Sequence, residues 1–83
     1  MNIDEIRTVL RTFIMEKFEI PADDADFDDD VHLFDYGYVD SFGAVTIIDF
    51  IKERFGVEIT DMDLVTHSLN TINEVSALIA ERV

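Results

Sequence analysis

The middle of the chain carries the most informative pattern and reads Leu33-Phe34-Asp35-Tyr36-Gly37-Tyr38-Val39-Asp40-Ser41-Phe42-Gly43. An apolar pattern with helical spacing follows it directly and ends at Phe55-Gly56. This pattern predicts a helix from about 42 to 55, with Gly56 as a left-handed C-cap. The hydroxyl of Ser41 is therefore expected at the start of a helix.

Three further segments are predicted to be helical. Apolar residues recur at steps of three and four from 3 to 18, which indicates a helix with one core-facing stripe. Residues 61–66 are expected to form a short helix, and Thr71 with Glu74 fits a capping box at the start of the last helix. We expect an all-α fold, a small bundle of three main helices plus one short helix, in a single domain over 1–83.

The connection between the first two helices, about 19–40, is unusually long for so small a domain. Its apolar residues can fix it to the core, so we expect an anchored loop. These residues are Val31, Leu33, Phe34 and Val39. Residues 57–59 are expected to return the chain to the core, and Leu64 and Val65 are most simply core residues as well.

The charge of the chain restricts its partners. Nineteen acidic and six basic residues give a formal net charge of −13, which argues against nucleic acid and anionic lipid. The negative field of these charges attracts basic protein surfaces, although the same charge could simply keep a small protein soluble. No apolar run is long enough to span a membrane, and the first residues do not resemble a signal peptide. The chain has no cysteine, and we expect a cytoplasmic monomer.

Ser41 by itself is most simply an N-cap, which contributes about 1 kcal/mol over alanine. Its surroundings favour a site of covalent attachment, because free N–H groups and the helix dipole stabilise an anion at a helix start. Glycine costs about 1 kcal/mol relative to alanine within a helix, so Gly43 requires a reason. We expect that it leaves space for an attached arm.

The block Asp40-Ser41-Phe42, followed by Gly43, resembles the modification site of the acyl carrier protein family, with Phe42 in place of the usual leucine. The resemblance covers nearly the whole chain, from the first amphipathic helix through the acidic loop to the last helix. It implies that Ser41 receives 4′-phosphopantetheine from coenzyme A through a phosphopantetheinyl transferase. The thiol of this arm would carry acyl or aminoacyl groups as thioesters in fatty acid, lipid or specialised biosynthesis. The chain itself would be a non-catalytic carrier.

The resemblance also implies a docking surface on the exposed side of the second helix, for loading ligases, acyltransferases and synthases with basic patches. Helical spacing places five residues there: Phe42, Val45, Thr46, Asp49 and Glu53. In the family, a cavity between the second helix and the short third can shelter an acyl chain, and Phe50 and Phe55 are bulky enough to restrict it.

The resemblance leaves the cargo open. Thr46 and Lys52 depart from the row of acids that is usual in carriers of fatty acid synthesis. The run from Leu33 to Gly43 also resembles the D-alanyl carrier proteins. A D-alanyl or aminoacyl carrier, for cell-wall modification or peptide synthesis, is therefore the alternative function.

Other functions fit the sequence less well. An EF-hand that begins at Asp24 or Asp26 lacks the required glycine and glutamate, so no metal site is predicted. A hydrolase built from Ser41 with His32 or His67 needs a pocket and an oxyanion hole, for which so small a bundle has little room. An acidic helical protein-binding module without a cofactor is the second alternative, and modification of Ser41 distinguishes it from a carrier.

Overall fold

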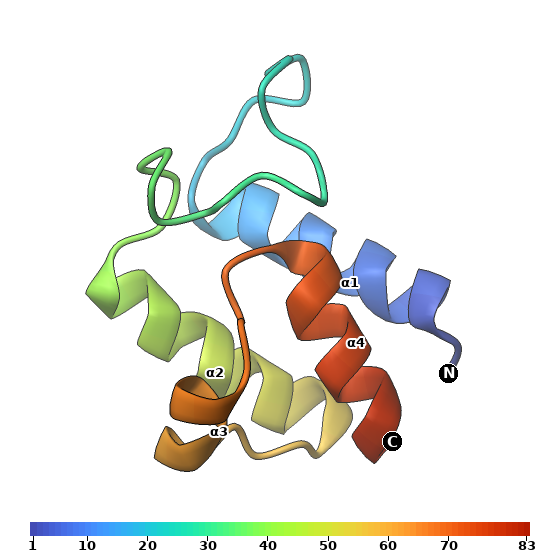
Figure 1. Cartoon of the computed structure of the whole chain (residues 1–83). Helices are drawn as coiled ribbons and strands as arrows, with labels where there is room; N and C mark the ends of the chain where they lie inside the picture. The colour runs from blue at the N-terminus through green and yellow to red at the C-terminus, as the bar shows by residue number, and fades with distance from the viewer.

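The computed structural model describes residues 1–83 and contains four α-helices and no strand (Figure 1). The helices are α1 (Ile3–Lys17), α2 (Ser41–Phe55), α3 (Asp61–Thr66) and α4 (Ile72–Arg82). This confirms the predicted all-α bundle of three main helices and one short helix. Gly56 ends α2 in the left-handed conformation, with φ of 70°, as predicted. None of the four helices has the length and apolar character needed to cross a membrane.

The core forms where the apolar faces of α1, α2 and α4 meet. Helices α1 and α4 lie in direct contact (Figure 1). Helix α2 meets α1 through larger side chains, with Phe50 stacked on Phe13 at a ring-centroid distance of 3.8 Å. Burial of these apolar faces is the main force that stabilises the bundle. The buried apolar residues of the three helices are Ile6, Leu10, Ile14, Ile47, Ile51, Ile72, Val75, Leu78 and Ile79.

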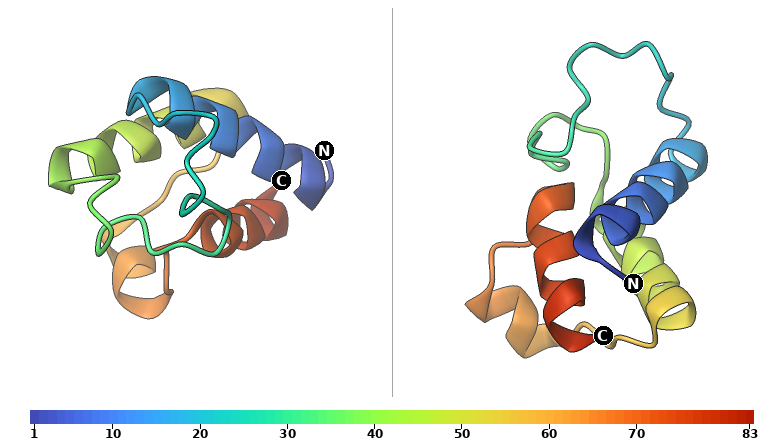
Figure 2. Two further views of the ribbon diagram at one scale, coloured as in Figure 1. Left: turned by 90° about the horizontal axis from the view of Figure 1, so that it is seen from above. Right: turned by 90° about the vertical axis from the view of Figure 1, so that its right-hand side faces the viewer.

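The segment between α1 and α2 has no regular structure but is fixed to the bundle at several points. The carboxylate of Asp29 accepts two hydrogen bonds from the guanidinium of Arg11, and its carbonyl accepts one from the Asn73 N–H at 3.0 Å. The buried residues of the segment are Ile20, Val31, Leu33 and Val39. The prediction of an anchored loop is therefore confirmed. Figure 2 shows that this loop lies at the end of the bundle away from both chain termini.

Helix α3 differs from the sequence-based expectation. Leu64 and Val65 are 50% and 81% exposed, so the prediction that both are core residues is wrong. So short a helix directs only one side inward, and in α3 the buried residue on that side is Asp63. Val57 and Ile59, in the segment that leads to α3, are buried as expected.

Candidate functional site

Ser41 is the first residue of α2, one position earlier than predicted. The N-cap is Asp40, whose Oδ1 accepts a hydrogen bond from the Gly43 N–H at 2.8 Å. The carbonyl of Asp40 accepts a second hydrogen bond from the Ala44 N–H at 2.9 Å. The interpretation of Ser41 as the cap is therefore wrong. Ser41 is exposed and its hydroxyl makes no hydrogen bond within the chain, so this hydroxyl is accessible from solvent.

Two backbone donors at the start of α2 have no acceptor in the chain, the N–H groups of Ser41 and Phe42. Unpaired N–H groups in the first turn carry the positive end of the helix dipole. A phosphodiester on the Ser41 hydroxyl would lie beside these donors, which favour an anion. The arrangement therefore fits a covalently attached phosphate group.

Gly43 has a role different from the one expected. The residue is buried, and a Cβ atom at this position would lie 2.8 Å from the side chains of both Phe18 and Val39. Glycine therefore allows the first turn of α2 to pack closely against the end of α1 and the loop. Space for an attached arm comes from the exposure of Ser41.

The outward face of α2 continues from Ser41 and combines apolar with acidic residues. Phe42 is 85% exposed and Val45 is 58% exposed. Asp49 and Glu53 are also exposed, while Thr46 is half-buried between them. The predicted exposure of this side of α2 is confirmed for Phe42, Val45, Asp49 and Glu53. Large apolar side chains exposed together on one helix face are typical of a contact surface for another protein.

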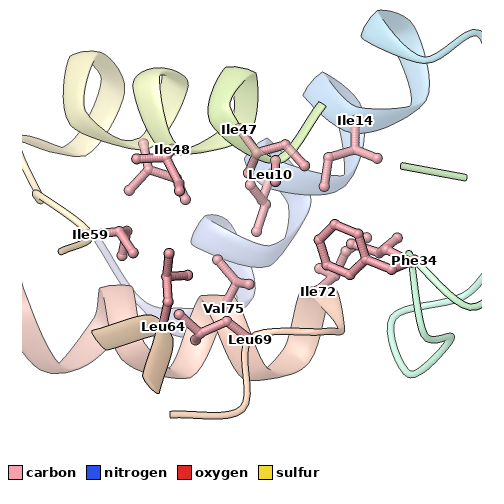
Figure 3. A pocket seen from close by; sticks show the side chains of 13 residues that line it. Leu10, Ile14, Phe34, Ile47, Ile48, Ile59, Leu64, Leu69, Ile72 and Val75 are labelled. Atoms are coloured by element: carbon pink, nitrogen blue, oxygen red, sulfur yellow. The ribbon is translucent and has the colours of Figure 1, made fainter. Parts of the chain in front are cut away.

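A cavity of about 50 Å³ lies within the bundle, and every side chain that lines it is apolar. Figure 3 shows Ile47 and Ile48 of α2 on one side and Leu64, Leu69 and Val75 on the other. The remaining lining residues are Leu10, Ile14, Leu33, Phe34, Ala44, Ile51, Ile59 and Ile72.

The cavity was expected between the second helix and the short third helix, and the structure corrects this expectation in two respects. The expectation that Phe50 and Phe55 restrict it is wrong, because neither lines it and Phe50 stacks on Phe13 instead. Sequence reasoning also missed that α1 and α4 contribute to the lining, through Leu10 and Val75 among others. The signal for those residues in the sequence is the apolar stripe of each helix, which indicates burial but not which stripe lines a cavity.

Comparison with models of protein families matches residues 8–79 to the family described as phosphopantetheine attachment site. No curated protein sequence matches the chain at a significant level. The family match extends from α1 into α4 and includes the start of α2 with its exposed Ser41 hydroxyl. The chain therefore belongs to the phosphopantetheine-attachment family of carrier domains, and its cofactor is 4′-phosphopantetheine.

Proposed function

We propose that the chain is an acyl carrier protein that holds its 4′-phosphopantetheine arm on Ser41 and presents acyl groups to partner enzymes. The exposed and unpaired hydroxyl of Ser41 at the start of α2 is the observation that carries this proposal. The chain has two other serines. Ser76 is fully buried, and Ser68 lies between α3 and α4 without a helix start beside it.

In the attachment step, Ser41 Oγ would form a bond to a phosphorus atom of coenzyme A, the bond to the nucleotide leaving group would break, and the hydroxyl proton would pass to a base. No side chain of the carrier is hydrogen-bonded to this hydroxyl, and we propose that the phosphopantetheinyl transferase supplies the base. Once attached, the arm supplies the thiol that holds cargo as a thioester. The chain has no cysteine, and we propose that it is not itself a catalyst.

The apolar cavity supports an acyl group rather than an aminoacyl group as the part of the cargo that the chain can bury. Burying a charged ammonium group without a partner costs free energy, whereas burying methylene groups is favourable. The cavity of about 50 Å³ is small. A cavity that takes up benzene measures about 150 Å³, so only a short apolar group fits unless a wall moves. A D-alanyl or aminoacyl cargo is the alternative, and it would stay outside the bundle.

Partner enzymes would dock on the outward face of α2. Phe42 and Val45 would act as apolar anchors, with Asp49 and Glu53 as acidic contacts and Thr46 between them. The net charge of −13 favours partners with basic patches. We propose that these partners are the transferase, a loading ligase, and acyltransferases or synthases of fatty acid, lipid or specialised biosynthesis in the cytoplasm.

The test is intact-mass measurement after incubation with coenzyme A and a phosphopantetheinyl transferase of broad specificity. The wild-type chain and Ser68→Ala should gain one phosphopantetheine group, and Ser41→Ala should gain none. Circular dichroism verifies that each variant is folded. Modification of Ser41→Ala would refute the assigned site. A folded wild-type chain that gains no group would refute the carrier function and favour the acidic protein-binding module.

A further inference from the structure

Helix α3 contributes one residue, Leu64, to the lining of the cavity, yet very little of the helix is buried. Its apolar side chains Met62, Leu64 and Val65 are 68%, 50% and 81% exposed. A helix of six residues is not stable by itself, so contacts with the rest of the chain must hold it in place. The buried residue of α3 is Asp63, which is 7% exposed. The contacts that hold α3 in place are therefore expected to involve Asp63.

The carboxylate of Asp63 is held from two directions. Its Oδ2 accepts hydrogen bonds from Thr60 N at 2.8 Å and Thr60 Oγ1 at 3.0 Å. The first of these, together with the bond from Asp63 N–H to Thr60 Oγ1 at 3.1 Å, forms the capping box of α3. Arg82, in the last turn of α4, donates from Nη1 to Oδ2 at 2.8 Å and from Nη2 to Oδ1. Arg82 Nη1 also donates to the carbonyl of Glu58 at 3.2 Å. One guanidinium thus ties both α3 and the segment before it to the end of α4.

The Arg82–Asp63 pair has the properties of a strong contact. It is bidentate and charge-assisted, the geometry in which arginine binds carboxylate best. The side chains of Arg82 and Asp63 are only 34% and 10% exposed, so water screens the pair less than a fully exposed one. The hydrogen bonds from Arg82 lower the pKa of Asp63 below its ordinary value, so the carboxylate is ionised at neutral pH.

We propose that Arg82 controls access to the apolar cavity by holding α3 over it. While Arg82 binds Asp63, Leu64 stays opposite Ile47 and Ile48, as Figure 3 shows, and the cavity keeps its volume of about 50 Å³. When the ion pair breaks, little apolar contact retains α3, so Leu64, which is already half exposed, leaves its place and the cavity opens more widely to solvent. Only the nature of the group that then enters rests on the proposed carrier function.

The absence of cysteine allows a direct test on the unmodified chain. Ile59→Cys places one thiol in the cavity lining at a position that is 8% exposed. Ile6→Cys places one in the core, at a fully buried position that does not line the cavity. In each background, the rate of labelling by an aromatic disulfide reagent is compared with and without Arg82→Gln. When reclosing is fast, labelling of a buried thiol follows the population of the open state.

We expect Arg82→Gln to speed the labelling of Ile59→Cys at least about tenfold, the factor for loss of one hydrogen bond to a charged group. The labelling of Ile6→Cys should change far less. Asp63→Asn should act like Arg82→Gln, and the double variant should add little, because both changes remove the same contact. Arg54→Gln is the matched control, since Arg54 is an exposed arginine outside every ion pair of the structure, and the Phe55 ring beneath its guanidinium does not line the cavity.

Amide hydrogen exchange of residues 61–66 in the cysteine-free Arg82→Gln variant provides a second measurement, and exchange should accelerate there more than in α1. Equal acceleration at both thiols would show that Arg82 stabilises the whole fold and not α3 in particular. Unchanged labelling at Ile59→Cys would show that the pair does not hold α3. Either result would overturn the proposal, and neither depends on whether Ser41 is modified.

Discussion

Replacement of Asp40 by alanine should destabilise the chain, whereas the same replacement at Ser41 should not. Asp40 Oδ1 accepts the hydrogen bond from the Gly43 N–H at 2.8 Å, and this N–H lies in a partly buried turn. Loss of such a cap costs about 1 kcal/mol, within a range of roughly 0.5–2 kcal/mol. The hydroxyl of Ser41 has no partner, and alanine is the better helix former by about 0.5 kcal/mol. Ser41→Ala should therefore be as stable as the wild type or slightly more stable.

Urea and thermal unfolding followed by circular dichroism measure this difference. A loss of about 1 kcal/mol lowers the Tm of a domain of this size by roughly 4–8 °C. Asp40→Asn keeps a capping side chain without its charge, so it should stay close to the wild type. This control separates the cap from relief of charge repulsion in a chain of net charge −13. Equal losses at Asp40→Ala and Ser41→Ala, or no loss at Asp40→Ala, would refute the assignment of Asp40 as the cap.

Three further predictions follow from the same geometry. Gly43→Ala should lower the free energy of unfolding, measured in urea, by about 1 kcal/mol. Overpacking against Phe18 costs about 1–3 kcal/mol, which exceeds the roughly 1 kcal/mol that alanine gains in helix propensity. A more stable variant would contradict the packing argument. Asp63→Asn should have a lower free energy of unfolding than the wild type at neutral pH, and this difference should disappear in acid. The reason is that Arg82 lowers the pKa of Asp63 in the folded chain. The stabilisation that the Asp63 carboxylate gives is therefore complete above the pKa of aspartate in the unfolded state, near 4, and is lost as the pH falls through the pKa of the folded state. A difference in stability that grows in acid would count against the Arg82–Asp63 pair. Asp49→Lys should slow cargo loading at low salt and less so at high salt, with unchanged thermal unfolding; loading rates of the wild type and variant that match at every salt concentration would exclude Asp49 from docking.

The features that the sequence predicted correctly are those with local causes. The apolar stripe of α1 and the capping box of Thr71 and Glu74 follow from helical periodicity and side-chain chemistry within a few residues. Gly56 likewise marks the end of α2, because a left-handed C-cap favours glycine. The outward exposure of Phe42 and Val45 follows from helix geometry alone.

The features that the sequence did not predict depend on contacts between distant residues. Arg82 and Asp63 are separated by 19 positions, and no periodic pattern links them. The reason for Gly43 lies in its contact with Phe18, at the end of another helix. Whether Asp40 or Ser41 caps α2 is a choice between adjacent polar residues, and both are good caps by type. The cavity lining combines all four helices, so only the packed structure defines it.

Fragmentation mass spectrometry can localise the attached group and so decide whether Ser41 carries the arm. The wild-type chain is treated with coenzyme A and a phosphopantetheinyl transferase, digested, and each modified peptide is sequenced. We predict one phosphopantetheine group, on Ser41, in the peptide that contains the start of α2. A group on Ser68 or on any other residue, or no group on a chain shown to be folded, would contradict it.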